Sequence, residues 1–293
     1  MQLSPKRFIT ACSLLVVLAV FLLWRSNRRT GADVANAAPT RVQFETDSVN
    51  NLSMSDVLRM AQDARAHMAQ NLDDYTARFV KREVDSNGVL GGETEMLMKV
   101  QTRLRGETEE APMRVYLSFQ SPESVKGREV IWAEDLYDGK MAVHEVGLLL
   151  SLKTIWLDPD GFFAMQGQRY PISEIGMVRL VEKLIERGEK DRDNPDISVT
   201  ISRDHMHGDT PTQLIQVRRA KPSGGEDDFS LAEIVIDPER QLILKYQSFG
   251  WTQAAGGDPP LLESYTFYDV KTNVGLSEAD FDPANPNYNF PSL

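Results

Sequence analysis

A long run of period-two alternation between residues 93 and 132 is the feature that most constrains how this chain can fold. From Glu95 to Arg105, apolar or small side chains alternate with charged and amide side chains. After a short polar turn, Met113 to Gln120 repeats the alternation, and Gly127 to Ala133 supplies a third run. Successive side chains of a strand point to opposite faces, so the pattern predicts three antiparallel strands with one packed and one solvated face. Such a sheet needs a cover on its apolar face.

Helical spacing on either side of these strands supplies candidates for that cover. Ser53 is predicted to begin a helix that extends to Leu72, with Asp56 three residues on as the acid of a capping box. A second helix is predicted to open at Pro171 and Ser173 and to end at Gly188. The block from 148 to 188 is therefore the natural lid of the sheet.

Further strands are predicted before and after the central three. Period-two alternation and turn residues mark the following segments: Tyr75–Val84, Lys140–Val146, Ile197–Arg203, Gln213–Arg219, Phe229–Ile236, Leu242–Phe249 and Leu262–Val270. The tail from Asp282 to Leu293 has three prolines and no period, so we expect it to lie extended over the surface.

The N-terminus carries a 17-residue apolar run from Phe8 to Trp24 with basic residues on both sides. As a helix this run would span ~26 Å, which is within the usual range for one membrane span. Cleavage of a signal peptide at the small-x-small sequence Ala35-Asn36-Ala37 is the alternative, although this sequence lies well beyond the apolar run. The predicted organisation is an anchor over residues 1–29, a linker over 30–51 and a folded domain over 52–293.

Charge and cysteine usage exclude several classes of function. The first thirty residues hold five basic and no acidic side chains, which leaves 27 basic and 43 acidic side chains in the remaining chain, a formal charge of −16. A surface this acidic repels phosphate, which argues against nucleic acid and anionic lipid surfaces as partners. Cys12 is the only cysteine, so neither a disulfide framework nor a zinc site of cysteines can form.

The apolar face of the predicted sheet is rich in methionine, a flexible side chain that can repack around an irregular guest. The same stripe is also typical of an ordinary packed core. As a hypothesis, a ligand cavity draws on residues of the sheet and of the lid: Phe79, Met96, Met98, Val115, Leu117, Phe119, Trp132, Trp156, Phe162, Phe163 and Met177. Arg169 and Tyr170, just before the lid helix, are predicted at the cavity rim, where a cation could hold a lipid head group or carboxylate.

His205 and His207 form the only cluster with ligand-like spacing, because side chains two apart on an extended segment face the same side. A third distant histidine that would complete a zinc site is lacking, and a polar hairpin tip explains the segment equally well. Motifs of serine hydrolases, phosphate-binding loops and metalloproteases are absent from the sequence. We therefore predict no catalytic residue, no metal site and no cofactor.

Several stretches resemble an uncharacterised bacterial family, frequent in planctomycetes, that is similar to the periplasmic lipoprotein-carrier (LolA-like) superfamily. The resemblance covers roughly residues 52 to 290 and is carried by residues 75–79, 121–129, 167–172, 174–176, 268–276 and 280–282. It implies an α+β fold, in which a curved antiparallel half-barrel sheet has helices on its concave face. It also implies the handling of apolar ligands outside the cytoplasm.

Taken together, the sequence predicts a single-pass membrane protein with a half-barrel domain outside the cytoplasm. The predicted role is non-enzymatic binding of a lipid or an acylated protein. Two alternatives remain: a cell-envelope protein-interaction module with a closed core, and a metal-dependent hydrolase that uses the region of His205 and His207.

Overall fold

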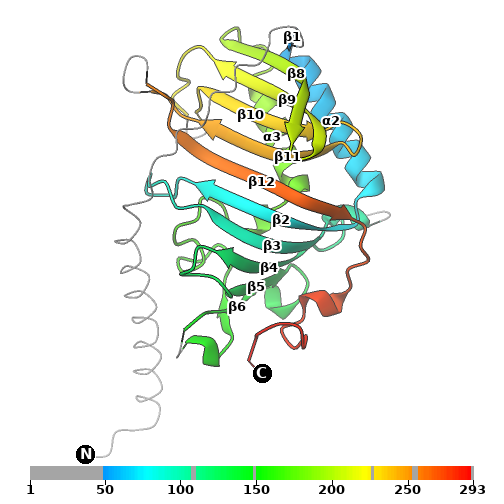
Figure 1. The fold of residues 1–293 in the computed structure, drawn as a ribbon, viewed down its shortest axis with the longest axis vertical. Helices are drawn as coiled ribbons and strands as arrows, with labels where there is room; N and C mark the ends of the chain where they lie inside the picture. Colours follow the sequence, from blue (N-terminus) through cyan, green and yellow to red (C-terminus); the bar gives the residue numbers. More distant parts are fainter. Residues whose placement is uncertain (1–48, 107–109, 148–149, 226–227, 253–256, 292–293) are drawn as a thin grey trace, which may run out of the picture. The chain divides into compact units, whose positions relative to one another are not determined.

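The computed structural model describes residues 49–106, 110–147, 150–225, 228–252 and 257–291, and within these ranges the chain forms an antiparallel sheet with two α-helices (Figure 1). The strands are β1 Val49–Leu52, β2 Asp74–Glu83, β3 Thr94–Gln101, β4 Arg114–Ser121, β5 Glu129–Ala133, β6 Met141–His144, β7 Ile155–Leu157, β8 Ile197–His207, β9 Thr210–Arg219, β10 Leu231–Asp237, β11 Leu242–Phe249 and β12 Leu261–Thr272. The helices are α2 Met54–Asn71 and α3 Met177–Lys190. The predicted α+β class is confirmed.

Strand order runs β1-β8-β9-β10-β11-β12-β2-β3-β4-β5-β6-β7, and the sheet stays open between its edge strands β1 and β7. The three central strands of the sequence prediction are β3, β4 and β5, which pair consecutively as expected. The last strand, β12, pairs with the early strand β2 and so joins the two halves of the chain. This open antiparallel arrangement fits the predicted half-barrel.

Both helices pack on one face of the sheet, here called the inner face, and form its main core. Val57 and Met68 of α2 and Met177 and Val181 of α3 share one buried cluster with Phe79, Met98 and other inner-face side chains. Helix α2 begins where the sequence predicts, because Ser53 and Asp56 form the capping box. The apolar stripe of each helix therefore faces the apolar face of the strands.

The start of α3 differs from the prediction. Ile172–Glu174 form a separate 3-10 turn after Pro171, and the α-helix begins only at Met177. Gly176 separates the two with a φ of +100°, a backbone conformation that breaks helical continuity. The helix also continues two residues beyond Gly188, to Lys190.

The outer face of β4 to β6 is covered, where the alternation predicts solvent. The 3-10 helix Glu278–Phe281 and the chain after it (Figure 1, red) bury Phe281 and Phe290 against Tyr116, Ile131 and Ala142, which forms a second core. Tyr288 stacks on Tyr116 with ring centroids 4.1 Å apart. The C-terminal tail is thus an integral part of the fold.

Two stretches that carry the family resemblance fasten this tail. The carboxylate of Asp74 accepts hydrogen bonds from the backbone N–H groups of Val274, Gly275 and Leu276, at 2.7 to 3.2 Å. The buried carboxylate of Glu129 accepts bonds from the backbone N–H of Asn289 at 2.7 Å and from the Tyr116 hydroxyl at 2.9 Å. These charge-assisted bonds hold the tail at both of its ends.

The described part of the chain begins within the segment predicted as a linker. Val49–Leu52 form β1, which pairs with β8 at the sheet edge. The predicted anchor from Phe8 to Trp24 lies outside the described residues. Among the helices formed by residues 49 to 291, apart from the gaps given above, none combines the length and the apolar character that a membrane span needs.

Candidate ligand-binding site

Residues 168–176, here called the strap, lie along β2 on the inner face, and helix α3 follows the strap and packs against α2 and β11. At one end of the strap, the backbone N–H of Arg169 donates to the carboxylate of Glu83, at the end of β2. At the other end, the N–H of Met177 donates to the hydroxyl of Tyr75, at the start of β2, over 3.1 Å. Helix α3 then returns toward Glu263, which Arg187 contacts at 3.3 Å. The strap and α3 thus form a lid whose two ends differ in chemistry.

One end of the lid rests on a set of buried and half-buried charged and hydroxyl side chains, here called the inner polar group. It comprises Lys81, Glu83, Arg169, Tyr170, Arg187, Tyr246, Glu263 and Tyr265. Tyr265 donates to Glu83 at 2.5 Å and Tyr170 accepts from both Arg169 and Arg187 at 2.9 Å. The strap, α3 and three strands meet in this one network.

Glu83 and Glu263 are direct cross-strand partners, an arrangement of like charges that destabilises a sheet unless cations balance it. Lys81 lies 2.9 Å from Glu83, and Arg169 lies 3.6 Å from Glu263. Burial opposes the charged form of Arg169, but its bond to Tyr170 and the attraction of Glu263 raise its pKa above the usual value. Lys81 of β2 and the two arginines of the lid, Arg169 and Arg187, thus contribute the cations that make the two buried carboxylates tolerable.

The tyrosines of the inner polar group stay neutral; Tyr246 and Tyr265 donate hydrogen bonds to carboxylates, whereas Tyr170 accepts from the two arginines. Burial, and after it the negative charge of Glu263, raises the pKa of Tyr265 and of Tyr246 well above the ordinary value. Burial and Glu263 raise the pKa of Tyr170 in the same way.

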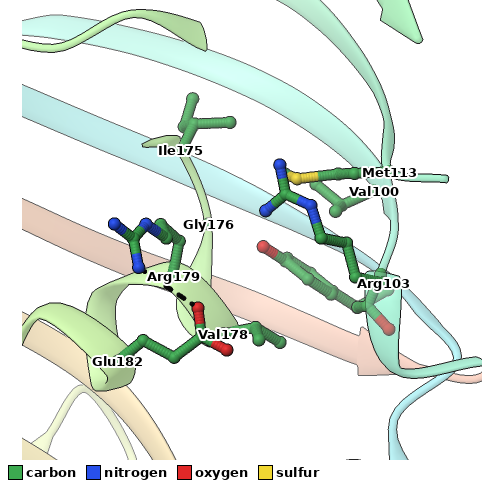
Figure 2. A pocket seen from close by; sticks show the side chains of 10 residues that line it. Val100, Arg103, Met113, Ile175, Gly176, Val178, Arg179 and Glu182 are labelled. Atoms are coloured by element: carbon green, nitrogen blue, oxygen red, sulfur yellow. Dashed lines mark hydrogen bonds and ion pairs between the residues drawn. The ribbon is translucent and has the colours of Figure 1, made fainter. Parts of the chain in front are cut away.

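The other end of the lid leaves a hollow of about 20 Å³ between α3 and the strands β2 to β4 (Figure 2), enough for about one water molecule. Figure 2 shows side chains of the sheet side facing those of the strap and α3. The hollow is lined by Tyr75, Val100, Thr102, Arg103, Met113, Ile175, Gly176, Val178, Arg179 and Glu182. Its floor is apolar, and its charged groups are two arginines and one glutamate.

Close approach of the strap to β2 at this end depends on Gly176. A Cβ atom on this residue would lie 2.6 Å from the Tyr75 hydroxyl oxygen, which is closer than real contacts allow. The Tyr75 hydroxyl is fully buried, and burial raises the pKa of its phenol well above the ordinary value. Gly176 therefore lets the hydroxyl reach the first N–H of α3, which helix geometry leaves without an intrahelical partner.

Most of the side chains predicted to line a ligand cavity lie together on the inner face. Phe119 packs half-buried against the main cluster. Seven others belong to that cluster: Phe79, Met96, Met98, Val115, Leu117, Trp132 and Met177. Three lid residues lie on the surface instead: Trp156 is 36%, Phe162 68% and Phe163 47% exposed. The structure brings the sheet residues and Met177 together and separates the aromatic lid residues from them.

Arg169 and Tyr170 adjoin the inner face, as a rim position requires, but they sit within the inner polar group. His205 and His207 lie within β8, which extends beyond the predicted hairpin boundary at Arg203. His205 bonds Thr212, and His207 bonds the backbone carbonyl of Phe267 at 3.2 Å. Across the described ranges, no three His, Cys, Asp or Glu side chains are arranged to hold a metal ion.

Sequence reasoning missed the two buried carboxylates and the arginines of the hollow. A signal for the carboxylates was present, because Lys81 and Glu83 continue the alternation of Phe79, and Glu263 and Tyr265 continue that of Phe267. Charged residues on a core face need partners. Arg103 and Arg179 gave no such signal, because neither position breaks a pattern.

Three solved structures illustrate what this chain is similar to. A putative outer membrane lipoprotein-sorting protein domain from Vibrio parahaemolyticus has 12% identity, a TM-score of 0.33 and coverage of 78% of this chain and 97% of its own. A LolA superfamily protein from Nitrosomonas europaea has 10% identity, a TM-score of 0.28 and coverage of 76% and 97%. The Pseudomonas aeruginosa MucA/MucB complex has 14% identity, a TM-score of 0.40 and coverage of 76% and 60%.

No curated protein sequence matches the chain. A family profile described as "Protein of unknown function (DUF1571)" matches residues 72–290, which include the inner polar group, the hollow and most of the tail. The match spans well over half of the chain. The uncharacterised family expected from the sequence motifs is therefore confirmed, and the chain belongs to the DUF1571 family.

Proposed function

We propose that this protein is a non-enzymatic binding protein of the cell envelope that takes up a lipid or an acylated protein between the inner face and the lid. In this proposal residues 1–29 anchor the chain in the membrane and the half-barrel domain lies outside the cytoplasm. The inner-face residues Met96, Met98, Val115, Leu117 and Met177 contact the acyl chain once the lid has moved.

The thin attachment of α3 is the observation that carries this proposal. Of its 14 residues only Met177 and Val181 are fully buried, whereas α2 buries four apolar side chains. Exposing Met177 and Val181 alone costs roughly 3–6 kcal/mol, and the partly buried Leu180, Leu184 and Ile185 of the same helix add to this cost. An acyl chain with about ten buried methylenes contributes ~8 kcal/mol, at about 0.8 kcal/mol each. A bound chain therefore offsets the exposure of these two side chains and part of the remaining cost of moving α3.

Photolabelling tests this function on the full chain in nanodiscs. A fatty acid with a photoreactive group at the end of its chain is added, and labelled peptides are identified by mass spectrometry. We expect saturable labelling of peptides from β3, β4 and α3, and competition by unlabelled fatty acid. Labelling confined to residues 8–24, or none at all, would contradict the proposal.

A matched pair of substitutions locates the site. Val178→Trp fills the hollow, and we expect it to reduce labelling severalfold. Leu97→Trp places the same side chain on the solvent-exposed outer face of β3, and labelling should stay unchanged. Equal labelling of both variants would place the acyl chain elsewhere.

A protein-interaction module is the second candidate function, and exposed apolar side chains in the segment before the strap favour it. Leu152, Trp156, Phe162 and Phe163 lie within one short segment and are exposed, and clustered apolar exposure marks contact sites. A photoreactive phenylalanine analogue at position 162 should crosslink a discrete envelope protein in intact cells. The same analogue at exposed Val89 serves as the control and should not.

A further inference from the structure

We propose that the hollow receives the head group of the ligand, and that this ligand is an amphiphile with an anionic head, such as a carboxylate. The inference rests on the proposed function and adds the chemical class of the ligand. It assigns the head group to Arg103 and Arg179, at the opposite end of the lid from Arg169 and Tyr170.

The composition of the hollow supports an amphiphile. Val100, Met113, Ile175 and Val178 give it an apolar floor that continues into the main core. Arg103 and Arg179 flank it from the sheet side and the helix side (Figure 2). Glu182 is the only acidic residue among its lining side chains, and it is paired with Arg65 at 2.8 Å.

Both arginines have hydrogen-bonding capacity left for a ligand. Arg103 donates from Nε and Nη2 to Glu134, and Arg179 donates from Nε and Nη1 to Glu174, Glu182 and Glu186. A guanidinium has five N–H donors. Among the residues that the structure describes, Nη1 of Arg103 and Nη2 of Arg179 donate no hydrogen bond, so each can bind an oxyanion without losing its present partner.

The exposure of the present partners also separates the two ends of the lid. Glu134 and Glu186 have 32% and 58% of their side-chain surface exposed, and Glu174 and Glu182, the other partners of Arg179, have 24% and 25%, so water screens the carboxylates around the hollow. Glu83 and Glu263 are buried and would stay in place as negative charges beside Arg169 and Arg187. An anionic head group thus meets less repulsion in the hollow than in the inner polar group.

The test compares three photoreactive probes with identical chains and different heads, a carboxylate, a hydroxyl and a trimethylammonium group. The full chain in nanodiscs is labelled with each. We expect half-saturation by the carboxylate at about tenfold lower concentration than by the other two, because hydrogen bonds to charged groups are the stronger ones. The double variant R103Q/R179Q should lose this preference and keep its labelling by the hydroxyl probe.

The control variant R59Q/R192Q removes two surface arginines and changes the net charge equally, and it should keep the preference. Equal labelling of the wild-type chain by all three probes would overturn the head-group assignment and leave the proposed function standing. A carboxylate preference that persists in R103Q/R179Q would also overturn it. Absence of labelling by every probe would overturn both. The comparison on the wild-type chain needs no variant, so a folding defect cannot obscure it.

Discussion

Gly176 is the residue on which the junction between strap and α3 depends. We expect Gly176→Ala to destabilise the protein by about 1–3 kcal/mol, because φ is +100° and the new Cβ would meet the Tyr75 hydroxyl. Thermal or denaturant unfolding of the full chain measures the change.

Gly88 offers the matched control. Its φ of +76° would strain the backbone of an alanine, but nothing lies within 4 Å of the added Cβ. Gly88→Ala should therefore cost less than Gly176→Ala. Tyr75→Phe removes the obstructing oxygen, so the double variant with Gly176→Ala should be more stable than the sum of the single changes predicts. Strict additivity would show that the contact does not limit stability.

The inner polar group also makes a prediction for a single residue. Arg169→Gln removes the cation that lies 3.6 Å from Glu263 and the bond to Tyr170. Hydrogen exchange of the strap, residues 168–176, should accelerate about tenfold or more, because hydrogen bonds of charged groups stabilise by about 1.5–3 kcal/mol. Helix α2 should exchange as before, and Arg192→Gln on the surface should change neither segment.

The charged residues of the inner face were only partly predictable from the sequence. The positions of Lys81, Glu83 and Glu263 on the inner face follow from alternation alone. Their partners do not, because Arg169 and Arg187 come from the lid, far away in the sequence. Periodicity tells which face a side chain is on, but long-range contacts decide what it meets there.

Among the elements, the end of the β8–β9 hairpin, residues 203–212, should loosen in acid. A bulge after Ser202 lets it bend over the outer face, where the ring of His207 stacks on Tyr268 with centroids 4.8 Å apart. Burial lowers the pKa of His205 below 6.5, and repulsion from His207 and Lys245 lowers it further. The attraction of Glu233 acts in the opposite direction but is weaker. Burial, together with repulsion from Lys245, also lowers the pKa of His207, although the hydrogen bond to the Phe267 carbonyl acts in the opposite direction.

The sign follows from proton binding. Below pH 6.5 the unfolded chain takes up protons that the folded hairpin does not yet bind, so stability falls as the pH is lowered through this range. Hydrogen exchange of residues 203–212 should be faster at pH 5.5 than at pH 7.5, beyond the intrinsic pH effect. The double variant His205→Asn/His207→Asn should lose this difference, and His67→Gln on α2 should retain it. An unchanged difference in the double variant would contradict the assignment.

Element prediction succeeded where local chemistry decides the boundary. The capping box of Ser53 and Asp56 placed the start of α2 correctly. The predicted start of α3 was wrong. Pro171 and Ser173 are helix-opening residues, but the close contact of Gly176 with Tyr75, on the distant strand β2, is not visible in the local sequence. Strand β1 was not recognised because a four-residue edge strand has too few residues to show a period.

The C-terminal tail gives the sheet a second buried core, on the face opposite the two helices. Phe281→Ala should destabilise the protein by about 3–5 kcal/mol, because its ring is fully buried in the second core. Val274→Ala, at an exposed position before the 3-10 helix Glu278–Phe281, is the control and should have little effect. Denaturant unfolding followed by tryptophan fluorescence measures both changes, and equal stabilities would show that the tail is only loosely attached.

The architecture of the sheet was largely predictable, because alternation marks nearly every strand. The second core was not, since the outer face of β4 reads as polar and Tyr116 is compatible with solvent. Only the tail's return over β4 to β6 reveals that Tyr116 and Ile131 are covered. For the same reason the sequence could indicate an apolar inner face but not how α2 and α3 fill it.

The pairing of β2 with β12 has a consequence for the order in which the protein folds. Strands β2 to β7 are synthesised first and can pair with one another, but the remaining hydrogen-bonding edge of β2 stays open until β12 has been made. Sheets that depend on such distant pairings fold slowly, and an open edge invites association with other chains. The nascent chain therefore needs protection until its last strand arrives, and a chain truncated before residue 261 would leave β2 as an aggregation-prone edge.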